Sequence, residues 1–441
     1  MKTATITSGA IWKGLLSFFF PILLGTFFQQ LYNTVDAVIV GRFVNTKALA
    51  AVGGGTAIFV NLLVGFFVGV ASGSGVVISQ FFGAQNERET SMAVHSALVL
   101  SLIGGIAVML IGLAACRPAM HLIGTPDEIM DLSLEYLRIY FYGMIPLLLY
   151  NMGAGILRAS GNSLAPFVVL LAGCAANIVL DITLVVVLGM GVAGVAWATL
   201  ASQLLCACLT LAYLSRTGSA IRFDVKRLCF APHIVRSMVR IGLPAGLQGA
   251  MYTVSNLIIQ SNINRLGTQV IAAAASWSKI DAAFWMTVNA FGMAMTTFAG
   301  QNYGAGKPER VRRGTAECLA MCAGATVIFS VLICAFARQL LRIFTSDEAV
   351  IGYGMEIARL VAPTFIAYIS VEILSGTIRG CGQAVIPTLI TLVAVCLLRV
   401  VWMFAVVRFH RSILMIFISY PVTWTVSSAL FWLYYKKGKW C

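Results

Sequence analysis

The stretch GLLSFFFPILLGTFFQQLYNTV, residues 14–35, carries no charged side chain and is followed directly by Asp36. A predominantly apolar run of ~20 residues is long enough to cross the hydrocarbon core of a bilayer. The run is too long for the apolar core of a secretory signal peptide, and no convincing cleavage signal follows it. Because lipid offers the backbone no hydrogen bonds, we predict that this stretch is a membrane-spanning helix.

The composition of the whole chain agrees with this interpretation. Hydrophobic residues make up 59% of the 441 positions and charged residues only 10%, whereas soluble domains contain about 25% charged residues. The mean hydropathy is +0.91. Because so few charges could not cover the surface of a soluble protein, we expect nearly the entire chain to lie in the bilayer.

Further apolar stretches follow between charged breaks, and together they give twelve candidate spans in two sets of six. The first set lies at 14–38, 50–80, 92–115, 134–157, 165–188 and 191–214, and the second at 240–262, 270–300, 315–337, 354–378, 385–407 and 412–435. These segments are too long to be strands of a membrane barrel. The predicted fold class is therefore an all-α integral membrane protein with twelve transmembrane helices.

The two sets of spans also resemble each other in sequence. SQFFGAQNER (79–88) aligns with GQNYGAGKPER (300–310), and ILRASGNSLAP (156–166) aligns with TIRGCGQAVIP (377–387). A third landmark pairs PILLGTFFQQLYN with PAGLQGAMYTVSN, the segments that begin at Pro21 and Pro244. Three landmarks in one order indicate a duplication. An even number of spans per copy predicts a parallel repeat, with the substrate path at the interface of the halves.

A basic segment at 215–240 separates the two sets and carries six Lys or Arg residues against a single acid, Asp224. Positive residues gather in cytoplasmic loops, so we place this linker and both termini in the cytoplasm. The predicted domains are an N-terminal lobe at 1–214, the linker at 215–240 and a C-terminal lobe at 241–441. We attribute the net charge of +14 to this topology and expect no nucleic-acid partner.

The chain carries no signature of catalysis or of a bound cofactor. Its sequence contains no nucleophile elbow, P-loop or HExxH motif, so neither an enzyme nor ATP-driven transport has support. The 11 cysteines show no paired CxxC spacing, and the four histidines share no metal-like spacing. We therefore expect a non-enzymatic protein without a cofactor.

Ionisable groups inside membrane helices are costly and mark functional sites, and among the acids within predicted spans we single out Asp36, Asp181, Asp281 and Glu372. The polar residues Gln29, Tyr32 and Asn33 precede Asp36 at spacings that place all four side chains near one helical face. We expect Gln29, Tyr32 and Asn33 to be candidates for the lining of a substrate cavity.

Asp181 has Asn177 one turn earlier on the same face of the fifth span. Two carboxylates with amide and hydroxyl neighbours can form an oxygen cage for Na⁺ or a proton site. A capping or helix-binding role is the structural alternative. At the aligned positions of the second half, Asp36 becomes Ile259 or Gln260, and Asn177 and Asp181 become Leu398 and Trp402. This asymmetry predicts that the first lobe alone holds a coupling ion.

The seventh span carries a polar stripe at four-residue spacing: Gln248, Tyr252, Asn256 and Gln260. This face predicts either a substrate-lining wall or hydrogen bonds to a neighbouring helix. Glu372 in the tenth span is a candidate counter-charge for a cationic substrate, and the alternative is a buried ion pair with Arg399. For Asp281 we expect a local surface pair with Lys279.

Several motifs in order resemble the MATE family of multidrug exporters. They are DAVIVGR (36–42) followed by ALAAVG (48–53), the doubled Q-x-x-G-A loops, the LRxxG and IRGxG loops, and NIVLD with GVAGVAWATLASQ within 177–203. The resemblance covers essentially the whole chain. The resemblance implies two six-helix lobes arranged as a V, and transport by alternating access. It also implies that the family's cation site lies at Asp36, Asn177, Asp181 and Thr199. These four residues would be the metal ligands if the ion is Na⁺.

The resemblance implies a secondary active antiporter that exports amphipathic or cationic organic compounds in exchange for H⁺ or Na⁺. NorM-like members carry an acid on the seventh helix, and its absence here favours the DinF-like branch. We expect a multi-pass protein of the bacterial inner membrane whose partners are a small-molecule substrate and membrane lipid, working as a monomer. The alternative function is a flippase for lipid-linked glycans, which Arg399 would favour and the mid-span acids oppose. An intramembrane enzyme or sensor lacks a catalytic constellation.

Overall fold

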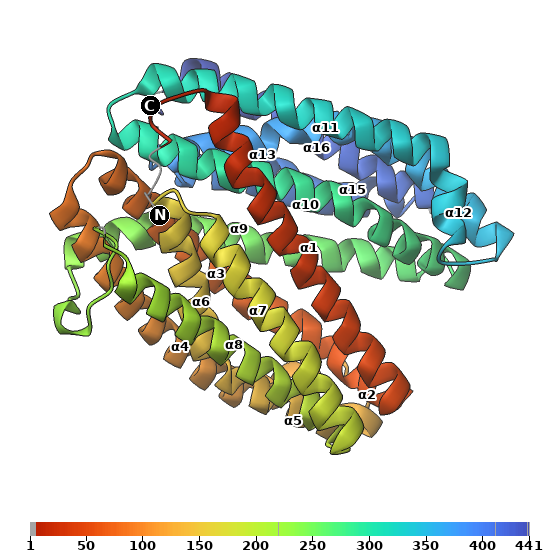
Figure 1. The fold of residues 1–441 in the computed structure, drawn as a ribbon. Helices are drawn as coiled ribbons and strands as arrows, with labels where there is room; N and C mark the ends of the chain where they lie inside the picture. The colour runs from red at the N-terminus through yellow and green to blue at the C-terminus, as the bar shows by residue number, and fades with distance from the viewer. Residues whose placement is uncertain (1–5, 219, 411, 439, 441) are drawn as a thin grey trace. The chain divides into compact units, whose positions relative to one another are not determined.

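The computed structural model describes residues 6–218, 220–410, 412–438 and 440, and all regular structure in these ranges is helical (Figure 1). The first half contains α1 (Ile11–Phe43), α2 (Thr46–Gly53), α3 (Gly55–Gly83), α4 (Glu87–Ile123), α5 (Asp127–Tyr142), α6 (Met144–Ala159), α7 (Leu164–Asp181), the π-helix η1 (Ile182–Val187) and α8 (Gly191–Arg216). A 3₁₀ turn, η2 (Val225–Arg227), lies in the connection to the second half.

The second half contains α9 (Pro232–Asn264), α10 (Thr268–Gly304), α11 (Pro308–Arg342), α12 (Glu348–Val361), the 3₁₀ turn η3 (Ala362–Thr364), α13 (Phe365–Gly380), α14 (Val385–Thr391), the π-helix η4 (Leu392–Leu397), α15 (Leu398–Trp402), the π-helix η5 (Met403–Val407) and α16 (Ile413–Lys437). Each of the twelve predicted spans falls on one helix or on a run of consecutive helices.

The prediction of an all-α, multi-pass membrane protein is confirmed. Among the described helices, nine are long and apolar enough to cross a bilayer, and α5 with α6, bent by 48°, forms a tenth candidate. The other two predicted spans lie on α9 and α10, which have 33 and 37 residues. Both helices carry polar side chains near their middle, which lowers their hydropathy. Their assignment as membrane spans therefore depends more on the internal repeat than on hydropathy.

Contacts divide the chain into two compact units. The first unit is built mainly from Phe20–Gly249, and the second joins Ser8–Phe19 to Ala250–Cys441. The helices α1 and α9 therefore each contribute residues to both units. The division into lobes at 1–214 and 241–441 stays a prediction.

Within the first unit, α3 meets the beginning of α9 through glycines. A Cβ atom added to Gly73 would lie 2.4 Å from the backbone nitrogen of Gly242, and one added to Gly69 would lie 2.4 Å from Gly246 Cα. The two helices thus touch backbone to backbone, the close approach that small residues permit between membrane helices. The linker lies against the same unit, since Asp224 N donates to His95 Nε2 at 3.2 Å.

Within the second unit, α10 packs against α11, α12 and α13, and α16 covers α12 and α13. Aromatic rings fill the core: Phe284 on α10 stacks on Phe365 at the start of α13, with ring centroids 3.8 Å apart. Trp424 on α16 is buried beside them. Trp424 also lines a cavity described below.

The duplication is visible in the helix bounds. For example, α6 at Met144–Ala159 matches α13 at Phe365–Gly380. A π-helix also begins one residue after Asp181 in the first half and one residue after Trp402 in the second. Since π-helical turns are rare and gather at functional sites, this shared backbone feature directs attention to both positions.

Candidate functional site

The first unit brings together two acids that are far apart in the sequence. Asp36 lies on α1 and Asp181 is the last residue of α7, and their carboxyl groups lie close enough to interact with each other. Asp181 is fully buried, and Asn177, one turn earlier on α7, is 1% exposed. The structure thus places three of the four predicted cation ligands on two adjoining helices.

These polar groups lack hydrogen-bond partners among the described residues. The unpartnered atoms are Oδ1 of Asp36, both carboxylate oxygens of Asp181, and both side-chain polar atoms of Asn177. Two ionised carboxylates only accept hydrogen bonds, so they can bond to each other only when a proton sits between them. Burying such groups without a compensating charge is costly. The arrangement therefore suits a proton or a small cation at this position.

Tyrosines from a third helix surround the acid pair. Tyr136 and Tyr140 on α5 stack with ring centroids 5.7 Å apart, and both lie near Asp36. Tyr32 on α1 also lies near Asp36. Our sequence analysis missed Tyr136 and Tyr140, although their four-residue spacing on one face of a predicted span was the signal that could have found them.

Thr199, the fourth predicted ligand, lies on α8 and is 8% exposed. Its hydroxyl donates to the carbonyl of Val195 at 3.0 Å. Thr199 lines a cavity of about 10 Å³ together with Tyr140 and Gln203, which is room for one water molecule at most. Thr199 therefore adjoins the acid pair through the tyrosine rather than by a recorded contact with either carboxylate.

The remaining polar residues on α1 occupy a different environment. Gln29 and Asn33 are exposed, whereas Tyr32 is half-buried. Along the predicted stripe of α1, partly buried Tyr32 and Asp36 thus alternate with the two exposed amides.

The second unit contains a much larger cavity of about 650 Å³. Three members of the predicted polar stripe on α9 line it: Tyr252, Asn256 and Gln260. Gln248 is not among the lining residues, because the helix passes into the first unit at Gly249. The other walls carry charged and aromatic side chains, among them Asp281, Glu372, Arg399, Trp277, Trp285, Tyr368, Tyr420 and Trp424.

The charged groups of this cavity are not paired with one another. Among the ion pairs of the described residues, none joins Glu372 to Arg399, and Glu372 accepts instead from the hydroxyl of Tyr368 at 3.4 Å. The expected pair between Lys279 and Asp281 is wrong. Asp281 turns inward and accepts a hydrogen bond from Trp285 Nε1 at 3.2 Å, because the indole is one helical turn away on the cavity side.

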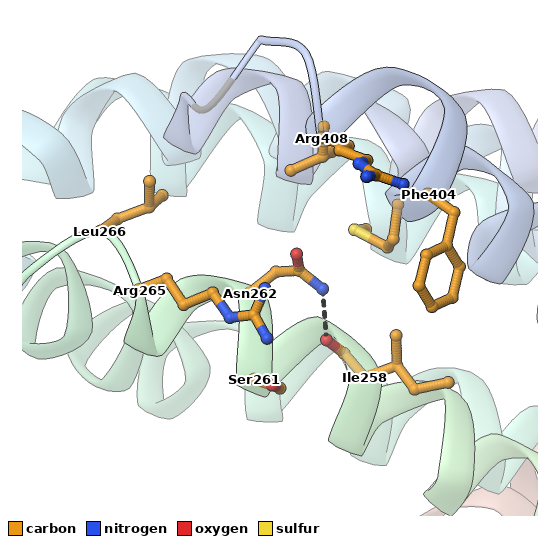
Figure 2. A pocket seen from close by; sticks show the side chains of 9 residues that line it. Ile258, Ser261, Asn262, Arg265, Leu266, Phe404 and Arg408 are labelled. Carbon is orange, nitrogen blue, oxygen red and sulfur yellow. Dashed lines mark hydrogen bonds between the residues drawn. The ribbon is translucent and has the colours of Figure 1, made fainter.

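A second cavity of about 490 Å³, which the sequence analysis did not predict, is lined by the end of α9 and by η5 with the residue after it. Figure 2 shows Asn262 on α9 and Arg265, just after its end, facing Phe404 and Arg408 across it. The Asn262 amide donates to the carbonyl of Ile258 at 2.8 Å. Both arginines are exposed, which distinguishes them from Arg399 in the larger cavity.

Comparison with known proteins places these sites in context. The MatE family model matches residues 21–183 and 244–405. Two similar proteins come from Bacillus subtilis (strain 168). The "Probable multidrug resistance protein YoeA" is 28% identical, and the match covers 97% of this chain and 94% of that protein. The "Probable multidrug resistance protein YpnP" is 27% identical, and the match covers 100% of this chain and 98% of that protein. A solved structure of MATE in the bent conformation is 22% identical and covers 99% of this chain and 97% of its own, with a TM-score of 0.91. At that identity the structural likeness concerns the fold.

Proposed function

We infer the function of this protein from one premise: the chain belongs to the MatE family. We propose that it is a secondary active antiporter that exports amphipathic, cationic organic compounds in exchange for H⁺ or Na⁺ by alternating access. Its small-molecule substrates would include drugs and toxic metabolites, consistent with the multidrug-resistance names of the two Bacillus relatives.

The observation that supports the coupling mechanism is the unpartnered acid pair in the first unit. Asp36, Asn177 and Asp181 together present five buried polar atoms without partners among the described residues. Carboxylate and amide oxygens are hard ligands suited to Na⁺, and a shared proton would relieve the same repulsion. Thr199 completes the proposed set of site residues from α8.

Occupancy of this pair would control the packing of the helices that carry it. Without a cation, two like charges on α1 and α7 repel, whereas a bound proton or Na⁺ allows the helices to approach. A ligand shifts a conformational equilibrium only by its differential affinity for the two states. A cation that favours one packing and a substrate that favours the other would therefore exclude each other, which is the requirement for exchange.

The cavity of the second unit is the proposed substrate site. Asp281 and Glu372 supply negative charge for an ammonium group, and the aromatic walls supply flat apolar surfaces. Because α9 carries no acid along its length, we place the chain in the DinF-like rather than the NorM-like branch. We further propose a monomer in the bacterial cytoplasmic membrane with both termini in the cytoplasm.

The test is transport by the purified protein in proteoliposomes under separately imposed pH and Na⁺ gradients. Asp36→Asn should abolish gradient-driven movement of a fluorescent organic cation, because it removes one charge of the pair. Val38→Ala, on the same helix but 53% exposed, serves as the control for helix integrity and should retain transport. Wild-type flux in D36N would refute the coupling site.

A flippase for lipid-linked glycans is the second candidate function. The buried Arg399 favours it, since a guanidinium binds phosphate oxygens well, whereas Asp281 and Glu372 in the same cavity would repel a pyrophosphate. Translocation of a fluorescent lipid-linked glycan in proteoliposomes, without any ion gradient, would favour the flippase over the antiporter.

A further inference from the structure

The smaller cavity of the second unit has two arginines and no acid among the described residues that line it. It measures about 490 Å³, and its charged lining residues are Arg265, just after the end of α9, and Arg408, just after η5. Both side chains are exposed, and among the described residues neither belongs to an ion pair. Figure 2 shows the two arginines on opposite walls. Two positive charges without a counter-charge give the cavity a positive potential, which attracts an anion.

The uncharged polar groups of this cavity add one further donor. The amide of Asn262 donates to the carbonyl of Ile258 at 2.8 Å, so it is engaged within α9. Ser261 lies one helical turn before Arg265, and its hydroxyl is exposed beside the guanidinium (Figure 2). The planar fork of a guanidinium matches the oxygens of a phosphate group. The donors of the cavity therefore suit a phosphate better than any cation.

The two arginines lie just beyond the ends of predicted spans. Arg265 follows the span 240–262 by three residues, and Arg408 follows the span 385–407 by one. In the topology proposed above, both spans end on the outer side of the membrane, where Lys and Arg are less frequent than in cytoplasmic loops. The positive-inside bias therefore does not account for this pair. The phosphate groups of lipids lie at the same depth, directly outside the hydrocarbon core.

An exposed apolar stripe leads along the second half to this cavity. Its side chains recur at every third or fourth position from α14 to η5 and are between 48% and 63% exposed: Leu389, Val393, Leu397, Val401 and Phe404. Phe404 also lines the cavity. In a bilayer such a stripe contacts acyl chains. A positive cavity at the end of an apolar stripe matches the two parts of a phospholipid, its headgroup and its chain.

We propose that this cavity binds an anionic phospholipid of the outer leaflet, with its phosphate oxygens on Arg265 and Arg408 and an acyl chain along the apolar stripe. A volume of about 490 Å³ lies in the ordinary range of ligand sites and exceeds what one phosphate group fills. The remaining space accommodates the glycerol part of the lipid. The site is separate from the larger cavity and takes no part in ion coupling.

The experiment uses a phosphatidylglycerol with a photoactivatable diazirine in one acyl chain. The purified full chain in detergent is irradiated with this probe, and the labelled peptides are mapped by mass spectrometry. The segment around Phe404 should be labelled. Unlabelled phosphatidylglycerol should suppress this labelling at a concentration about tenfold or more below that of phosphatidylcholine, because the choline adds a positive charge beside two arginines. Sodium phosphate at matched ionic strength should compete only weakly, because it lacks the chains.

The variants separate the arginines of the cavity from general lipid contact. The double variant R265Q/R408Q should reduce labelling near Phe404 by about tenfold or more, whereas R265K/R408K should keep part of it. The matched control is Arg42→Gln, which removes an exposed arginine at the end of α1 that does not line the cavity. Labelling of Ile328 on α11, 61% exposed, reports ordinary lipid contact and should stay equal in all variants.

Three results would overturn the proposal. They are equal competition by phosphatidylcholine and phosphatidylglycerol, undiminished labelling near Phe404 in R265Q/R408Q, and competition by sodium phosphate as strong as that of the lipid, which would assign the cavity to a free anion. If the double glutamine variant does not fold, the competition on the wild type still decides the question. D36N should lose transport but keep the labelling, so failure of the antiport mechanism and failure of the lipid site give different patterns.

Discussion

The residues before the matched π-helices η1 and η5 show how the two halves diverged. In the first half this residue is Asp181, whose carboxylate is buried without a partner. In the second half it is Trp402, whose indole donates to the carbonyl of Met415 at 2.8 Å. The backbone kept the same rare turn, but the polar group before it lacks a partner in the first copy and has one in the second.

The charged groups of the second half lie at other positions of the repeat, and they line a much larger cavity. Arg399 and Glu372 line a cavity of about 650 Å³, whereas the space beside Tyr140 and Thr199 in the first half measures about 10 Å³. Two buried acids with little space around them suit an ion, and a large aromatic cavity suits an organic molecule. The comparison shows that one duplicated scaffold carries buried acids in a tight space in one copy and a large polar and aromatic cavity in the other, and we propose that this difference divides ion binding from substrate binding.

We expect the largest loss of transport from a substitution at Asp181. Asp181→Asn removes the buried charge that the coupling cation neutralises, so we expect gradient-driven transport in proteoliposomes to fall to the level of empty liposomes. Trp402→Phe, at the matching position, removes an indole N–H but no charge and should keep most of the transport. Equal losses in both variants would show that the position serves folding and not coupling.

A smaller effect is expected at Glu372. Glu372→Gln keeps the shape of the side chain but removes its charge, so binding of Nα-dansyl-lysine methyl ester should weaken by about tenfold, the effect of one charged hydrogen bond. The dependence of transport on the ion gradient should persist. Glu356→Gln on α12, an exposed residue, is the control. If E372Q changes the ion dependence instead, the division between the halves is incomplete.

Tyr140 tests the surroundings of the acid pair. Tyr140→Phe removes a hydroxyl that lies near Asp36, and a hydrogen bond from this hydroxyl to the occupied site would contribute about 1 kcal/mol. The cation concentration for half-maximal transport should therefore shift by about threefold to tenfold. Tyr142→Phe on the same helix, where the side chain is 51% exposed, should cause no shift. A shift of equal size in Y142F would remove Tyr140 from the proposed site.

The amino-acid sequence predicted much of the fold because apolar length and repeated loops are local patterns. It also predicted Asp36, Asn177 and Asp181, since an acid in an apolar helix stands out without knowledge of its neighbours. It did not predict the approach of Tyr136 and Tyr140 from α5, because aromatic residues are common in membrane helices and only packing shows which ones meet an acid.

The environment of Arg399 also could not be predicted from the sequence. A guanidinium and a carboxylate in neighbouring spans favour an ion pair, and only the side-chain geometry shows that Thr423 and Tyr420 take that place. Likewise, Asp281 lies two residues from Lys279 but turns toward Trp285. In both cases the nearest opposite charge in the sequence was not the partner in space.

We expect the smallest effect on stability and transport from the loss of an exposed carboxylate. This substitution provides a comparison for the buried carboxylates. Glu348 accepts from Arg338 at 2.5 Å and from Arg342 at 2.8 Å at the surface. Exposed ion pairs contribute little, so Glu348→Gln should leave the midpoint of thermal denaturation nearly unchanged, with normal transport. A larger loss would mean that this pair of arginines holds the α11–α12 connection.

The glycine contact between α3 and α9 has a consequence for biosynthesis. Gly69 and Gly73 are made early, and their partners Gly242 and Gly246 follow only after the whole first half has been synthesised. No larger side chain can take the place of that backbone surface. The first half released alone from the ribosome would thus expose a bare glycine groove to lipid, and the unit can close only once α9 has entered the membrane.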